Sequence, residues 1–248
     1  MSTLILALAA GAVIGLALGA LGGGGSVLAV PALIYLLGFT PAAATTASLI
    51  IVTATSATAL YAHATSGNVR WKTGALFAAV GIPPAIAAAA LASRVPEALL
   101  TAAFAAIALL AALALFKAPT PDRQPRAVRP ARAAGAGVGL GAVTGFLGVG
   151  GGFLAVPALV SVLGLRMRAA VGTSLLVITV NSLAALVARA GTHTPLNWAV
   201  IAPFTGAAIL GAWDGKRLAA KISGPALQRA FASVLLAVAA LMVTDALH

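Results

Sequence analysis

Two runs of glycine are the residues most able to do chemistry in this chain, because each interrupts an apolar stretch. The first run occupies positions 22–25, and the second occupies 148–152, where only Val149 is not glycine. Consecutive glycines break helices, since glycine alone enters left-handed and extended conformations at little cost. At membrane depth such a break exposes backbone N–H groups, which are tolerated only around a cavity. With the positive end of the helix that follows, these groups predict an anion site at each run.

The same glycines also allow a purely structural interpretation, in which they act as hinges. Six other glycines are spaced four apart, as in membrane helices that pack closely, and for these we expect packing alone: Gly11, Gly15, Gly19, Gly137, Gly141 and Gly145. Residues of the two runs are consecutive, so they surround a helix and form no packing stripe. We therefore expect the runs to bind substrate.

Hydroxyl groups recur after each run and could donate hydrogen bonds to an anion. Ser48 and Ser174 are equivalent in TTASL and VGTSL, and Thr45 shares a helix face with Ser48. TATSAT and ITVNS follow one or two turns later, and Asn181 in the latter is an amide that needs partners if buried. Such hydroxyls also bond their own backbone or join helices. The predicted substrate-binding residues are Gly22, Gly23, Gly24, Gly25, Ser26, Thr45, Ser48, Gly148, Gly150, Gly151, Gly152, Ser174 and Asn181.

Two ionisable residues, His63 and Arg189, occupy matching positions near the ends of apolar segments. They could relay a proton for coupling or attract the anion. Residues that reach from a helix end toward the lipid headgroups have the same placement. We expect this interfacial role for both residues and keep the functional one as the alternative.

The composition is that of a membrane protein. Of 248 residues, 61% are hydrophobic and 8% are charged, whereas a soluble domain carries about 25% charged residues. The chain has no cysteine, three histidines and four acidic residues, an inventory that disfavours metal and catalytic sites. We therefore expect no enzymatic activity, no metal and no cofactor. The net charge of +11 lies at segment ends and in one loop without interleaved aromatic residues, so we expect no nucleic acid partner.

The chain is a duplication of one unit. When 11–33 is aligned with 137–159, a shift of 126 positions, 13 of 23 residues are identical, which is too many for chance. After one inserted residue, Trp71 aligns with Trp198. These matches predict a first transmembrane repeat at 1–116, a basic linker at 117–132 and a second transmembrane repeat at 133–248.

Each repeat contains five apolar segments, and a spanning helix needs about 20 apolar residues. The segments are 3–21, 26–38, 42–64, 73–93 and 97–116, then 133–147, 152–164, 169–190, 197–213 and 224–246. The second segment of each repeat is short, which predicts a half-helix or re-entrant arm. The expected fold is an all-α polytopic membrane protein with two inverted-topology repeats and broken or re-entrant half-helices at the glycine runs.

The basic residues predict the orientation. A cytoplasmic linker at 117–132 places thirteen basic residues inside and two outside, in keeping with the positive-inside rule. Both termini then lie outside, so each repeat crosses an odd number of times and the two repeats have opposite orientation. This architecture is common in secondary transporters. A total of six, eight or ten spans fits the pattern equally well.

The paired motifs LGGGGSVLAVPAL and LGVGGGFLAVPAL, followed by ATTASL and AVGTSL, resemble the TauE/SafE family of sulfite exporters. The resemblance covers essentially the whole chain. It implies transport of small sulfur oxyanions or organosulfonates, such as sulfite, thiosulfate or sulfoacetate. Val149 stands where the first repeat has Gly23, and Gly152 stands where it has Ser26, so the two half-sites differ chemically.

We therefore expect a multi-pass inner-membrane transporter, and specifically an exporter, that binds a small sulfur-containing anion near the membrane midplane. Within the predicted spans acidic residues occur only at the ends, at Glu97 and Asp245, which argues against cation transport. An anion channel with the glycine runs as its filter is the main alternative. An intramembrane enzyme and a scaffold without transport are weaker ones. The expected partners are the anion and the lipid bilayer, and association with a second copy of the chain stays open.

Overall fold

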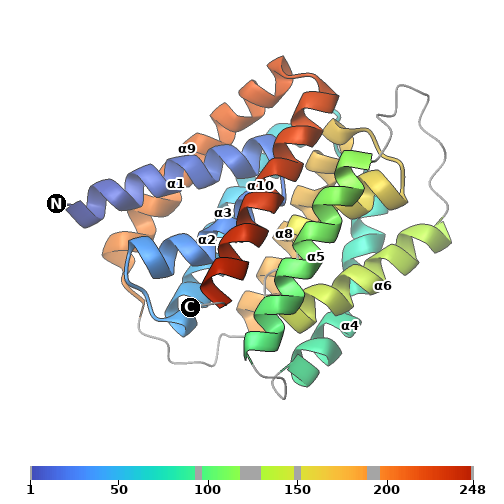
Figure 1. The fold of residues 1–248 in the computed structure, drawn as a ribbon. Coiled ribbons are helices and arrows are strands. Elements are labelled where there is room, and N and C mark those ends of the chain that lie inside the picture. The colour runs from blue at the N-terminus through green and yellow to red at the C-terminus, as the bar shows by residue number, and fades with distance from the viewer. Residues whose placement is uncertain (1, 93–96, 118–129, 148–151, 189–195, 247–248) are drawn as a thin grey trace.

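The protein is all-helical throughout the part of the chain that the structure describes (Figure 1). The computed structural model describes residues 2–92, 97–117, 130–147, 152–188 and 196–246. The first half contains α1 (Ser2–Leu21), α2 (Gly24–Pro31), the π-helix η1 (Ala32–Leu36), α3 (Pro41–Ala64), α4 (Trp71–Ala92) and α5 (Glu97–Lys117). The second half contains α6 (Pro130–Leu147), α7 (Gly152–Pro157), the π-helix η2 (Ala158–Val162), α8 (Met167–Ala188), α9 (Trp198–Lys221) and α10 (Gly224–Ala246).

Each of the ten predicted apolar segments corresponds to one helical element. The two short segments are the pairs α2–η1 and α7–η2. The clearest difference is at α9, which was expected to end at residue 213 and continues to Lys221. The predicted apolar segment ends where charged residues begin, whereas the backbone stays helical beyond it because Lys and Arg are good helix formers.

The short helices end in the same way in both repeats. Pro31 and Pro157 stand at the change from α- to π-helix, where a residue without an amide hydrogen cannot continue the ladder. Gly38 (φ +68°) and Gly164 (φ +65°) then adopt the left-handed conformation that commonly ends a helix. The next amides reach back to carbonyl groups six residues earlier, as in Phe39 N–H to Leu33 O at 3.0 Å.

Three helices of the described chain are long and apolar enough to cross a membrane. They cover Thr3–Leu21, Ala43–Ala64 and Met167–Val187, which lie in α1, α3 and α8. At the start of the second of these helices, Thr40 caps α3 by accepting a hydrogen bond from the amide of Ala43 at 3.4 Å, and Pro41 fits the first turn. The chain is therefore a helical membrane protein.

Glycines of α1 bring this helix into backbone contact with α9. A Cβ atom on Gly11 would overlap the carbonyl oxygen of Phe204, and a Cβ on Gly15 would overlap that of Ala208. Gly19 meets Ala212 in the same manner, so the two helices run in the same direction. The prediction that these glycines serve packing is confirmed.

The same contact occurs a second time between α4 and α6. A Cβ on Gly137 would lie 2.8 Å from the carbonyl oxygen of Phe77, and one on Gly141 would overlap that of Gly81. Gly137 and Gly141 are the counterparts of Gly11 and Gly15 in the duplication. The first helix of each repeat thus packs on the fourth helix of the other repeat. Figure 1 shows α1 with α9 on one flank and α4 with α6 on the opposite one, with the remaining helices between them.

Close packing at Gly141 makes a stability prediction with a control on the same helix. Gly141→Val places a branched side chain against the backbone of α4, so we expect the free energy of unfolding to fall by about 1–3 kcal/mol. Gly139→Val has the same helix propensity but meets no atom within 4 Å, and should leave stability unchanged. Thermal unfolding of both purified variants measures the difference. Equal midpoints would contradict the packing role of Gly141.

Candidate functional site

The first glycine run breaks the helix as predicted. α1 ends at Leu21, and Gly22 takes a left-handed φ of +69° while its amide still bonds to the carbonyl of Leu18 at 2.8 Å. Gly23 returns to helical angles as the cap of α2, and Gly24 and Gly25 are its first two residues. Only two of the four glycines therefore lie outside helices, and the others form the N-terminal turn of α2. The amides of such a first turn have no partner within their own helix.

Gly22 lies against the second repeat. A Cβ atom at this position would stand 2.5 Å from the Oγ of Ser174 and 3.2 Å from the carbonyl oxygen of Val171, both on α8. Val156 of α7 is the next neighbour, at 3.4 Å. Glycine is thus required at position 22 for two reasons, its left-handed φ and the absence of space. The structure brings together Gly22 and Ser174, two of the predicted site residues, from different repeats.

The predicted hydroxyl groups bond to the backbone of their own turns. Ser26 Oγ donates to the carbonyl of Gly23, Ser48 Oγ to that of Thr45, and Ser174 Oγ to that of Val171, each at 2.8 Å. All three serines are buried. This is the self-bonding arrangement expected of helical hydroxyls, and each group would have to rotate before it donated to an anion.

A second group of polar side chains, each buried or half-buried, lies where α3 crosses α8. Thr179 and Ser56 join the two helices through their hydroxyl groups at 2.9 Å. Within the described chain, four other buried oxygen atoms of these same turns have no hydrogen-bond partner: Thr53 Oγ1, Thr55 Oγ1, Asn181 Oδ1 and Ser182 Oγ. We call these six residues the polar seam. Buried polar atoms without partners are rare in proteins and point to a ligand or water.

Asn181 was among the predicted substrate-binding residues, whereas the other five members of the polar seam lie in the TATSAT and ITVNS runs but were not named as site residues. The duplication carried a signal for them, because Thr53 aligns with Thr179 and Ser56 aligns with Ser182. The two repeats therefore place hydroxyl groups at the same positions along equivalent helices, α3 and α8. The joining of Ser56 to Thr179 became visible only when the two helices were seen together.

His63 does not reach toward a membrane surface. Its side chain is 3% exposed, and Nε2 donates to the carbonyl oxygen of Gly19 on α1 at 3.0 Å. The close approach of α1 encloses the ring, so His63 does not extend outward as a side chain that reaches the headgroups would, and its role stays a prediction. Nδ1 is buried and has no partner among the described residues.

The second half-site is only partly described. Gly152 is the first residue of α7, and α7 contacts α2, so the helices that follow the two glycine runs meet. The remaining predicted members lie outside the described residues: Gly148, Gly150, Gly151 and Arg189. The described residues include no group of histidine and acidic side chains that could hold a metal ion.

The chain is similar to known proteins over nearly its whole length. The family model described as sulfite exporter TauE/SafE matches residues 7–242. Two curated relatives, each named a probable membrane transporter protein, come from the Temecula1 and 9a5c strains of Xylella fastidiosa. Each is 32% identical over 245 residues, which cover 96% of this chain and 94% of the relative. No solved structure matches the chain.

The contact of Gly22 with Ser174 predicts its counterpart, Gly148 with Ser48. The chain has no native cysteine, so paired substitutions can be oxidised without background. In Ser48→Cys/Gly148→Cys we expect a disulfide, because in the equivalent pair a Cβ at Gly22 would stand 2.5 Å from the Oγ of Ser174, close enough for two cysteines to bond. Loss of both thiols from maleimide labelling measures it.

Two further pairs calibrate this experiment. Gly22→Cys/Ser174→Cys should lose its thiols, while Ser48→Cys/Gly206→Cys should keep them, because no atom lies within 4 Å of a Cβ at Gly206. Full labelling of Ser48→Cys/Gly148→Cys, with the first control protected, would show that the second half-site is built differently.

Proposed function

The chain belongs to the TauE/SafE family of sulfite exporters, and we propose that it exports a small sulfur-containing anion, such as sulfite, thiosulfate or an organosulfonate, by secondary transport. The observation that carries this proposal is the helix break at Gly22, which lies buried against Ser174 of the other repeat. A break in a membrane helix at the junction of two repeats is where secondary transporters commonly bind substrate.

In this proposal the anion is bound by backbone amides at the start of α2. The first turn of a helix offers unpaired N–H groups and a partial positive charge, which together favour a negative ligand. Gly23, Gly24 and Gly25 have no side chain, so an anion can approach these amides closely. Ser26 and Ser174 would add hydroxyl donors once they rotate away from their own carbonyls. The glycines before α7 would supply the second half of the site.

We further propose that the two repeats are inverted in the membrane. Support comes from α3 and α8, the helices of the third apolar segment of each repeat as the duplication aligns them. Ser56 meets Thr179, and Asn68, just beyond α3, meets Gly172, so the equivalent helices run in opposite directions. With a cytoplasmic linker at 117–132, both termini of this multi-pass inner-membrane protein would lie outside. Movement of one repeat against the other would alternate access to the site.

The polar seam would continue the route of the anion through the protein. Its unpartnered oxygen atoms belong to hydroxyl groups, which can donate as well as accept, and to one amide. An anion that passes between α3 and α8 could receive hydrogen bonds from these groups without meeting a carboxylate. The four acidic residues of the chain, Glu97, Asp122, Asp214 and Asp245, lie near the ends of helices or in the linker.

Counterflow in proteoliposomes tests this function. Vesicles that contain the purified protein and unlabelled sulfite, thiosulfate, sulfoacetate, sulfate or chloride would be diluted into labelled sulfite. If the protein is a carrier, we expect labelled sulfite to enter faster when the vesicles contain unlabelled sulfite or a close relative of it than when they contain chloride. Flux without counterflow would instead identify a channel, and no flux with any anion would contradict both.

Gly22→Ala in the same assay should lower counterflow at least tenfold, because the added methyl group meets Ser174 within the proposed site. Gly38→Ala is the matched control, since Gly38 has nearly the same φ, +68° against +69°, but no atom within 4 Å of its Cβ. The two variants share the cost of a left-handed alanine, so similar thermal unfolding would separate function from folding. Wild-type counterflow by Gly22→Ala would overturn the proposed site.

A further inference from the structure

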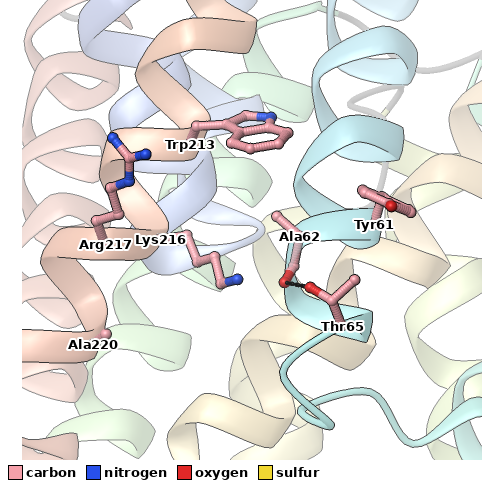
Figure 2. A pocket seen from close by; sticks show the side chains of 7 residues that line it. All are labelled: Tyr61, Ala62, Thr65, Trp213, Lys216, Arg217 and Ala220. Atoms are coloured by element: carbon pink, nitrogen blue, oxygen red, sulfur yellow. Dashed lines mark hydrogen bonds between the residues drawn. The ribbon is translucent and has the colours of Figure 1, made fainter.

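A pocket of about 330 Å³ lies between the end of α3 and the end of α9 (Figure 2). Tyr61 and Thr65 line it from α3, and Trp213, Lys216 and Arg217 line it from α9. The pocket therefore combines two cations, two aromatic side chains and a hydroxyl group. None of these residues belongs to the glycine runs or to the polar seam.

The positive charge of this pocket exceeds what its neighbours neutralise. Arg217 Nη1 lies 3.2 Å from Asp214 Oδ1, and both side chains of this ion pair are well exposed. Lys216 forms no ion pair with any residue that the structure describes. Figure 2 shows its ammonium group extended into the space between the two helices. Asp214 thus neutralises Arg217, whereas Lys216 has no such carboxylate beside it, which leaves the pocket ready for an anionic group.

The pocket opens on the outer surface of the helix bundle. Leu210, Trp213 and Arg217 are spaced three and four apart, which places them on one face of α9. Leu210 is 71% exposed, Trp213 45% and, across the pocket, Tyr61 65%. In a membrane protein an exposed apolar face contacts lipid, and Trp and Tyr concentrate at the level of the headgroups. The cations therefore lie where a lipid chain meets its headgroup.

The duplication indicates that packing alone does not require these side chains. When Trp71 is aligned with Trp198, a shift of 127 positions, the first repeat has Ala89 and Ala90 where α9 has Lys216 and Arg217. It has Ile86 in place of Trp213. The charges and the aromatic ring are thus confined to one end of the molecule, the end that the basic residues predict to be cytoplasmic.

We propose that this pocket binds the phosphate headgroup of an anionic phospholipid. Lys216 and Arg217 would contact the phosphate, and Tyr61 and Trp213 would flank the glycerol and the first methylene groups. The hydroxyl of Thr65 donates to the carbonyl of Ala62 at 2.8 Å and would have to rotate to donate to the lipid. Basic pockets between membrane helices on the cytoplasmic side recognise such headgroups, and that leaflet holds anionic lipids. The proposal is independent of the transported anion, because it involves other residues and a surface that faces lipid.

Lipid-dependent thermal unfolding of the purified protein tests this site. In neutral detergent with 150 mM salt, phosphatidylglycerol should raise the unfolding midpoint by roughly 5 °C at about a hundred times its dissociation constant. Phosphatidylcholine should not. Lys216→Gln should shift the phosphatidylglycerol concentration for half of the effect about tenfold upward, since one of two cations is lost. Lys221→Gln, on the same helix outside the pocket lining, should change it less than twofold.

Separate additions of inorganic phosphate and sulfite distinguish a lipid from a free anion. Phosphate should not raise the midpoint, and any rise with sulfite, the proposed substrate, should be the same in the wild type and in Lys216→Gln. If either does so in the wild type and not in Lys216→Gln, the pocket binds soluble anions and the lipid proposal is wrong. Equal stabilisation by the two lipids, or equal behaviour of Lys216→Gln and Lys221→Gln, would also overturn it. Midpoints in detergent alone show that both variants fold, so loss of structure cannot be mistaken for loss of binding.

Discussion

Contact between helix backbones at glycine is the constraint on which the rest of this structure depends. Apolar side chains gain little from packing on each other within lipid, so membrane helices associate where small residues allow close van der Waals contact. Here Gly11, Gly15 and Gly19 let α1 reach the backbone of α9, and Gly137 and Gly141 do the same for α6 on α4. Each repeat is thereby joined to the other at two places. The central helices, which carry the polar groups, are held between these pairs.

The broken helix is tolerable only because this arrangement encloses it. Gly22 exposes backbone that would be costly in lipid, yet α7 and α8 of the other repeat cover it. The same closeness buries His63, whose ring reaches the carbonyl of Gly19 on a helix already fixed by α9. Close packing and irregular backbone thus depend on each other. Close packing creates a protein interior within the membrane, and the irregular backbone supplies polar groups inside it.

Hydropathy alone predicted the helices, because length and apolar content decide whether a segment is helical in a membrane. The break at Gly22 was also predictable, since four consecutive glycines disfavour a continuous helix. What could not be read from sequence is which helices meet. The contact of Gly22 with Ser174 and the bond of Ser56 to Thr179 join residues more than a hundred positions apart. The burial of His63 depends on the same tertiary contacts, and its place near a helix end suggested the opposite.

Duplication explains the architecture, and the positions at which the two repeats carry different residues are those at which their chemistry can differ. In the inverted arrangement proposed above, two identical repeats would present the same groups to both sides of the membrane. This chain has Ser26 against Gly152 and Gly23 against Val149 beside the proposed anion site, and Lys216 against Ala89 at the bundle surface. None of these differences lies among the glycines of α1 and α6 that make the backbone contacts, such as Gly15 and its counterpart Gly141. The glycines of α1 and α6 thus keep the helix contacts in both repeats, while the asymmetric positions give the two repeats different chemistry.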